Sequence, residues 1–176
     1  MGLIDYLLEK TLKVSPDQLH RHECAECDAL VGDMLPSLPL GTPVFCHFTL
    51  NFAEHSGICI GDRIVRLDGG GQIISSTPRV FLARLNGRNL AANIYYAATG
   101  RNQPLAKSDI AIRALEAVGA HRDYHVLTYN CHGFSIRCIN GKSSCQAAWS
   151  IMEIENSITS VFGTDDWSWR CWDGWR

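Results

Sequence analysis

Two short segments of the chain hold the residues with the clearest capacity for chemistry. His55 begins the segment HSGICIGD, and Cys131 lies in the segment YNCHGFSIRC. Cysteine reacts as its thiolate, and a nearby imidazole can take the thiol proton and remain as the imidazolium. A helix N-terminus also stabilises a thiolate, because its unpaired N–H groups favour negative charge. This pattern predicts nucleophilic catalysis by Cys131, with His55 as the general base.

These segments, together with IVRLDGGG and STPRVFL between them, resemble the lecithin:retinol acyltransferase family. The resemblance spans about residues 41–142 and includes the patterns H-x-G-I-x-I-G-D and N-C-x-x-F-x-x-x-C-x-x-G. It implies a circularly permuted papain-like fold, shared with a superfamily of cell-wall endopeptidases and amidases, in which the His precedes the Cys. Carried over by position, it makes Cys131 the nucleophile and His55 the base, with the Cys131 backbone N–H in an oxyanion hole.

The third catalytic position departs from the family pattern. Animal members carry a second His on the next strand, whereas position 67 is Leu here. Our candidate is Asp68, because a carboxylate can accept the imidazole N–H and stabilise its cation. An Asp before Gly also commonly begins a turn, and this alternative stays open. Tyr129 and Asn130 are expected to complete the site by hydrogen bonding, and His132 to lie at the surface or behind the reacting groups.

The expected reaction is acyl transfer or hydrolysis through an acyl-thioester on Cys131, with a lipid acyl ester as the first substrate class. The same superfamily suggests an alternative, an amidase or peptidase that acts on peptide or cell-wall amides, such as a toxin delivered into a neighbouring cell. A catalytically inactive binding module is a further alternative, because the second His is absent. None of these reactions needs a cofactor, and we expect none.

Other cysteines offer a metal or redox alternative. The segment HRHECAEC contains His20, His22, Cys24 and Cys27, and a Cys-x-x-Cys with nearby His is typical of zinc sites. A structural zinc site usually joins two ligand pairs that are separated in sequence, so four ligands this close together would be cramped. We therefore expect no metal, with a Cys24–Cys27 redox pair as a lesser alternative. Cys59 and Cys138 are expected to pack in the core.

The elements that must position these residues follow an α+β pattern. Helices are predicted over 3–13, 107–119, 131–139 and 143–158, strands over 44–50, 56–60, 63–67, 72–75 and 93–99, and a loop over 33–43. Short connections between the strands favour a small antiparallel sheet packed with helices. Residues 55–67 in particular are predicted to form a β-hairpin.

The length of 176 residues indicates a single domain. We divide it into an N-terminal helical extension (1–40), a catalytic core (41–142) and a C-terminal helix with a Trp-rich tail (143–176). Hydrophobic residues make up 46% of the chain, which is enough for a core and argues against disorder. The net charge of −2 gives little support for a nucleic-acid partner.

The chain shows neither a long apolar run nor a signal-peptide pattern, which predicts a soluble, cytoplasmic protein. Export without a cleaved signal stays open. The Trp-rich tail is expected to pack on its own domain, with transient contact to a membrane surface as the alternative. Nothing in the sequence indicates a protein partner.

Overall fold

The computed structural model describes residues 37–47, 54–83, 93–122, 130–142, 148 and 150–174. Its strands are β1 (Leu38–His47), β2 (Glu54–Gly61), β3 (Ile64–Leu67), β4 (Ile73–Ser76), β5 (Ile94–Thr99) and β6 (Trp167–Trp172). Its helices are α2 (Pro78–Leu82), α3 (Ser108–Glu116), α4 (Cys131–Asn140) and α5 (Ile151–Phe162). The strands form one sheet in the order β4-β3-β2-β1-β5-β6, and each neighbouring pair is antiparallel. The predicted α+β class is confirmed.

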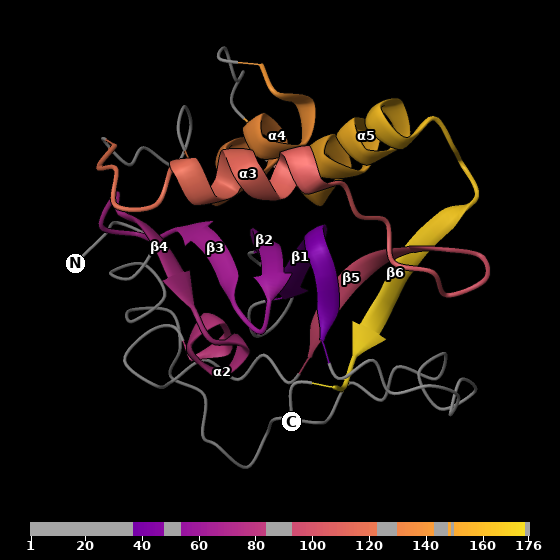
Figure 1. Cartoon of the computed structure of the whole chain (residues 1–176), viewed down its shortest axis with the longest axis horizontal. Helices are drawn as coiled ribbons and strands as arrows, with labels where there is room; N and C mark the ends of the chain where they lie inside the picture. Colours follow the sequence, from indigo (N-terminus) through magenta and orange to yellow (C-terminus); the bar gives the residue numbers. More distant parts are fainter. Residues whose placement is uncertain are drawn as a thin grey trace.

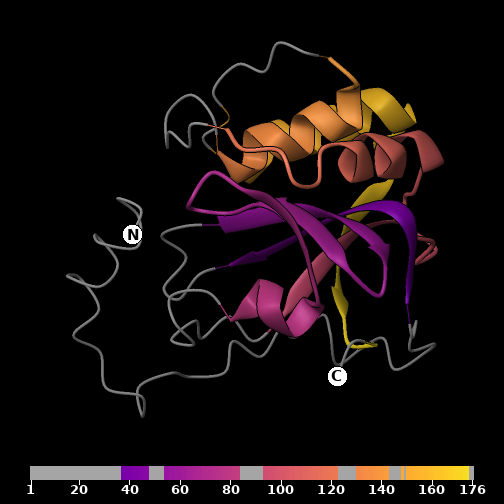
Figure 2. The same ribbon diagram turned by 60° about the vertical axis from the view of Figure 1, so that its left-hand side comes forward.

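Helices cover both faces of the sheet (Figures 1 and 2). The helices α3, α4 and α5 lie together on one face, and the short α2 lies on the other. Alternate residues of a strand point to opposite faces, and β2 follows this rule. Ile58 packs in the core beneath the three helices, whereas its neighbour Cys59 packs with Phe81 of α2. The two faces of β2 therefore belong to two separate hydrophobic clusters.

The predicted hairpin over 55–67 is confirmed as β2 and β3. Its register pairs Ile58 with Val65 and Cys59 with Ile64. The Ile60 N–H donates to the Arg63 carbonyl at 2.8 Å, which closes the turn between the strands. The strand that carries His55 is therefore held on both sides, by β3 and by β1.

The loop predicted over 33–43 is wrong from Leu38 onward, because β1 begins there. Pro39 and Pro43 suggested a loop, since proline cannot donate a backbone hydrogen bond to a strand ladder. The register of β1 against β2 is irregular between Leu38 and Thr42, and the Thr42 hydroxyl donates to the Pro39 carbonyl at 2.8 Å. This bulge accommodates a proline within a strand.

The C-terminal region differs from the prediction at two points. The last helix begins at Ile151 instead of 143, because Ser150 and Glu153 form a capping box at its start. The Trp-rich tail was not predicted as a strand, yet β6 pairs along β5 at the edge of the sheet. The indoles of Trp167 and Trp169 donate to Thr159 and Glu155 of α5, so the tail packs on its own domain.

In the described part of the chain, no helix is long and apolar enough to cross a membrane.

Candidate functional site

The first residue of α4 is Cys131, and the residue before it, Asn130, caps the helix. The Asn130 Oδ1 accepts the Gly133 N–H at 2.9 Å, and its Nδ2 donates to the Ala148 carbonyl at 2.6 Å. Asparagine is among the best N-cap residues because its side chain replaces a missing helix hydrogen bond. Asn130 therefore holds the start of α4 at a defined place, and Cys131 with it.

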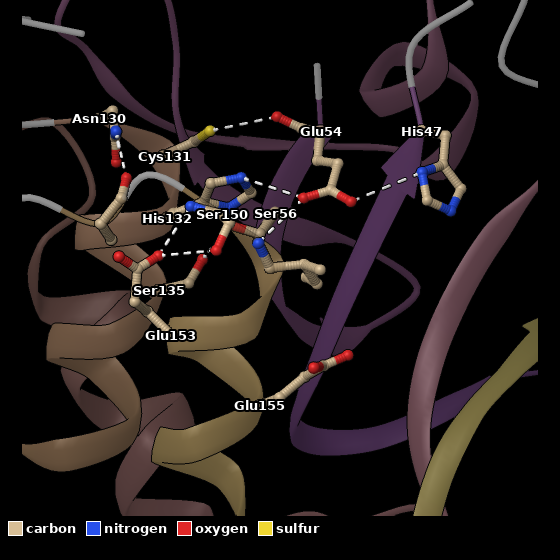
Figure 3. A network of polar contacts seen from close by, with 12 residues as sticks. His47, Glu54, Ser56, Asn130, Cys131, His132, Ser135, Ser150, Glu153 and Glu155 are labelled. Atoms are coloured by element: carbon tan, nitrogen blue, oxygen red, sulfur yellow. Dashed lines mark hydrogen bonds and ion pairs between the residues drawn. The ribbon is translucent and has the colours of Figure 1, made fainter. Parts of the chain in front are cut away.

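The thiol of Cys131 lies at the beginning of β2. Its Sγ is 3.9 Å from the backbone oxygen of Glu54, the first residue of that strand (Figure 3). Cys131 is 7% exposed, so it sits just below the surface. His55 is the next residue of β2 after Glu54. The structure therefore brings the predicted nucleophile to the end of the strand that carries the predicted base.

The imidazole of His55 lies on the sheet face that α2 covers. It stacks on the ring of Phe81, with ring centroids 4.8 Å apart and planes 29° apart, and it is fully buried. His55 pairs with Cys46 of β1, which belongs to the same cluster as Phe81. The next residue, Ser56, points instead to α4, so the structure does not bring the His55 imidazole to the sheet face on which α4 carries Cys131.

The carboxylate of Asp68 takes part in the turn between β3 and β4. Its Oδ1 accepts the N–H of Gly70 at 2.9 Å and the N–H of Gln72 at 2.8 Å. The Asp68 N–H donates to the Gln72 carbonyl at 2.8 Å. The alternative role of Asp68 as a turn residue is therefore present in the structure.

The same register also relates Asp68 to His55. If the pairing of Ile58 with Val65 were continued by three residues, Asp68 would stand opposite His55. Directly opposed residues of antiparallel strands project to the same face and have Cβ atoms about 5 Å apart. The turn that Asp68 stabilises thus lies beside the strand end at which His55 is found.

A buried polar network beside Cys131 was missed at the level of sequence. The Oγ of Ser56 lies 2.9 Å from Nδ1 of His132, and Ser135 donates its hydroxyl proton to the Ser56 Oγ at 2.9 Å. Of the two positions expected for His132, the one at the surface is wrong, because this residue is 5% exposed. The second position of α4 faces the sheet, and Ser56 meets it there.

The protons in this network can be assigned from its geometry. Ser56 accepts from Ser135, so its own hydroxyl proton is available for Nδ1 of His132. The neutral imidazole then carries its proton on Nε2, which lies 3.9 Å from Oε2 of Glu54. Burial lowers the pKa of His132 to about 4, and the nearby Glu153 carboxylate offsets only part of this effect. His132 is therefore neutral near pH 7.

Glu54 links this network to two other elements. Its Oε2 accepts the Ile151 N–H at 2.9 Å, at the first turn of α5, and its Oε1 lies 3.7 Å from Nδ1 of His47 on β1 (Figure 3). A carboxylate at a helix N-terminus interacts favourably with the helix dipole. Glu54 therefore joins β1, β2 and the starts of α4 and α5 around the Cys131 thiol.

Two further cysteines were expected to pack in the core, and this is confirmed. Cys59 and Cys138 are free thiols, 0% and 3% exposed. Burial raises the pKa of each to about 12. Both are therefore thiols of low reactivity near neutral pH.

Other predicted site residues lie outside the described part of the chain. These are Tyr129 and the candidate zinc ligands His20, His22, Cys24 and Cys27. Within the described residues, His, Cys, Asp and Glu side chains form no group of three or more that could hold a metal ion.

A sequence signal for the missed network existed in the alternation of β2. Since His55 and Ser56 are neighbours in a strand, they must face opposite sides of the sheet. Only one of them can therefore face the helix that carries Cys131 and His132.

The chain matches none of the family models, curated proteins or solved structures with which it was compared.

Proposed function

We propose that the chain is a cysteine-dependent acyltransferase or hydrolase that forms an acyl-thioester on Cys131. The observation that carries this proposal is the position of the Cys131 Sγ, 3.9 Å from the backbone oxygen of Glu54, the residue that precedes His55 in β2. The capped N-terminus of α4 supports it further, because that environment stabilises a thiolate. The resemblance of both motifs to the acyltransferase family makes a lipid acyl ester the first substrate class.

The proposed reaction has two steps. The first step requires the His55 imidazole, which stacks on Phe81 on the other face of the sheet, to reach the Cys131 thiol around the end of β2. His55 then takes the Cys131 proton, the thiolate attacks the acyl carbonyl carbon, and the backbone N–H of Cys131 stabilises the oxyanion. The bond to the leaving alcohol then breaks, and the alcohol takes its proton from the His55 imidazolium. In the second step His55 deprotonates water or an acceptor alcohol or amine, which attacks the thioester and releases the thiolate. The thiolate then takes its proton back from the His55 imidazolium. Asp68 is proposed to orient His55 through its carboxylate.

The proposal is tested by intact mass after incubation with a phospholipid or an activated fatty-acyl ester. Wild type is expected to gain one acyl group, and Cys131→Ala to gain none. Cys138→Ala is the matched control, because it removes a buried thiol from the same helix and should keep the adduct. His55→Phe retains a ring against Phe81 but lacks the base, and should form the adduct at least about a hundredfold more slowly.

Two other outcomes would change the proposal. Cleavage of a muropeptide amide without an adduct from either ester would favour the amidase alternative. Iodoacetamide provides a separate measure, because thiols with a pKa of about 12, such as Cys59 and Cys138, react slowly at neutral pH. If Cys131 is alkylated no faster than these two, and neither substrate reacts, then an enzymatic function is excluded and a binding module remains.

A further inference from the structure

A concave site lies at the opposite end of α4 from Cys131. Its volume is about 240 Å³, and it is formed between the ends of α3 and α4 and the chain that follows α3. Cys138 lies in its wall, seven residues after Cys131, and thus about 10 Å further along the helix axis. The pocket is therefore separate from the site proposed for catalysis.

The wall of this pocket is strongly basic although the chain as a whole is slightly acidic. Arg113, Arg122, Arg137 and Lys142 line it, against a single carboxylate, that of Glu116. The carboxyl ends of α3 and α4 also point toward this region, and each contributes about half a negative charge. Asp109 pairs with Arg113 at 2.9 Å, so the cations that remain for a ligand are Arg122, Arg137 and Lys142. With Glu116 and both helix ends included, about one positive charge is in excess.

One of the four basic residues has a structural role. The Arg113 guanidinium donates to the carbonyls of Cys138 and Ile139 at 2.6 and 3.1 Å, and it also bonds to Asp109 at 2.9 Å. It thereby satisfies carbonyls that α4 leaves unpaired at its end. Arg122 and Lys142, by contrast, are exposed. These exposed cations, with half-buried Arg137, provide the charge for a ligand.

The wall that carries Arg122 is held in place by the edge of the sheet. Gly119 donates to the Ile73 carbonyl at 2.9 Å, Ile73 donates to the Ala120 carbonyl at 3.0 Å, and Arg122 donates to the Gly71 carbonyl at 2.8 Å. These backbone bonds extend β4 by a short additional ladder. The opposite wall is a helix, so the pocket is preorganised on both sides.

The rest of the lining is apolar. Ile73, Ala117, Phe134 and Cys138 supply hydrocarbon and sulfur surface beside the cations. The volume is smaller than the roughly 300–1,000 Å³ of sites for drug-sized ligands. A fitting ligand is therefore small, is anionic with acceptor oxygens for the three cationic side chains, and bears a short apolar group.

We propose that this pocket binds a phosphomonoester that carries a short apolar group. A phosphomonoester is close to dianionic at neutral pH, and its oxygens match the planar donor array of arginine. A phosphomonoester offers three acceptor oxygens to the three cationic side chains, whereas a carboxylate offers only two, and inorganic phosphate would leave the apolar wall uncovered. The phosphomonoester can be a soluble metabolite or the head of phosphatidic acid, and the proposal does not depend on the reaction at Cys131.

The test is a titration of the ¹⁵N-labelled full chain with butyl phosphate, inorganic phosphate and butyrate, followed by the amide signals of Ala120 and Gly141. Butyl phosphate is expected to produce saturable shifts at lower concentration than the other two probes. The double variant Arg122→Gln, Lys142→Gln should bind at least about tenfold more weakly. Arg101→Gln, at an exposed turn that does not line the pocket, should bind as wild type does.

Absence of saturable shifts, or shifts that the double variant retains, would overturn the proposal. Vesicles of phosphatidylcholine with and without phosphatidic acid identify the source of the ligand. If the protein shows amide shifts with butyl phosphate and also binds vesicles only when they contain phosphatidic acid, and the double variant does not bind them, the ligand is a lipid. If butyl phosphate shifts the amide signals but the vesicles do not bind the protein, the ligand is a soluble ester. Vesicle binding without amide shifts overturns the proposal, because surface charge alone would then be responsible.

Discussion

Ser56 and His132 form a buried hydrogen bond between β2, one of the two central strands, and the helix that begins at Cys131. Their Oγ and Nδ1 atoms are 2.9 Å apart although the residues are 76 positions apart in the chain. Because His132 directly follows Cys131, this bond sets how the start of α4 sits on β2. The stability of this part of the molecule should depend on the neutral imidazole and on the serine hydroxyl.

Acidification should destabilise the folded protein through His132. Its pKa is about 4 when folded and about 6.5 when exposed, so the unfolded chain binds a proton more readily between these values. Stability is therefore expected to fall by roughly 3 kcal/mol as the pH decreases from 6.5 to 4. Urea denaturation across this range, in wild type and in His132→Gln, measures the difference. In His132→Gln the unfolding free energy should depend less on pH, whereas exposed His121→Gln should keep the wild-type dependence. The same pH dependence in all three proteins would contradict the role given to His132.

Removal of the Ser56 hydroxyl should cost about 1–3 kcal/mol of unfolding free energy. Ser56→Ala leaves Nδ1 of His132 buried without its donor, and Ser135 without its acceptor. Ser75→Ala is the matched control, since its hydroxyl accepts from the exposed Arg63 side chain and water can replace it. That variant should lose less than about 0.5 kcal/mol. Similar losses in both variants would show that the buried network adds little.

The two roles of Asp68 can be separated by Asp68→Asn. Asparagine keeps an oxygen for the amides of Gly70 and Gln72, so the turn and the thermal stability should be nearly unchanged. If the carboxylate orients His55, the rate of acyl-adduct formation should fall by about a hundredfold or more. Asp62→Asn, in the preceding turn, is the control and should keep the rate. An Asp68→Asn variant with wild-type rate would limit Asp68 to the turn.

The wall of the basic pocket should be sensitive to substitution at Gly71. A Cβ at Gly71 would lie 2.1 Å from the Arg122 carbonyl oxygen, and the residue has a φ of +84°. Gly119 has a similar φ of +87°, but its Cβ would meet nothing within 4 Å. Gly119→Ala should therefore cost about 1 kcal/mol from backbone strain alone, and Gly71→Ala at least about 3 kcal/mol. Thermal denaturation of both variants measures the difference, and equal costs would mean that the close approach relaxes easily.

Local sequence patterns were sufficient for several elements near the site. A short apolar run, a Gly-Asp turn and a following strand-like segment predicted the hairpin of β2 and β3. The helix that begins at Cys131 was placed within one residue of its observed end. Local sequence patterns did not predict the elements whose conformation depends on a partner strand far away in the sequence. β1 tolerates Pro39 because of a bulge against β2, and β6 is a strand because β5 is available to pair with it.

The sequence by itself determined the candidate chemistry, because a cysteine at the start of a helix and a histidine at the head of a strand are local features. Tertiary structure decided which side chains surround them. The pleat of β2 sends His55 toward Phe81 and Ser56 toward α4, and the register of the sheet places the Asp68 turn beside the same strand end. It also brought Arg122 beside the end of α4 to form the basic pocket. Such contacts depend on how whole elements pack across long stretches of chain, and no local spacing of residues encodes them.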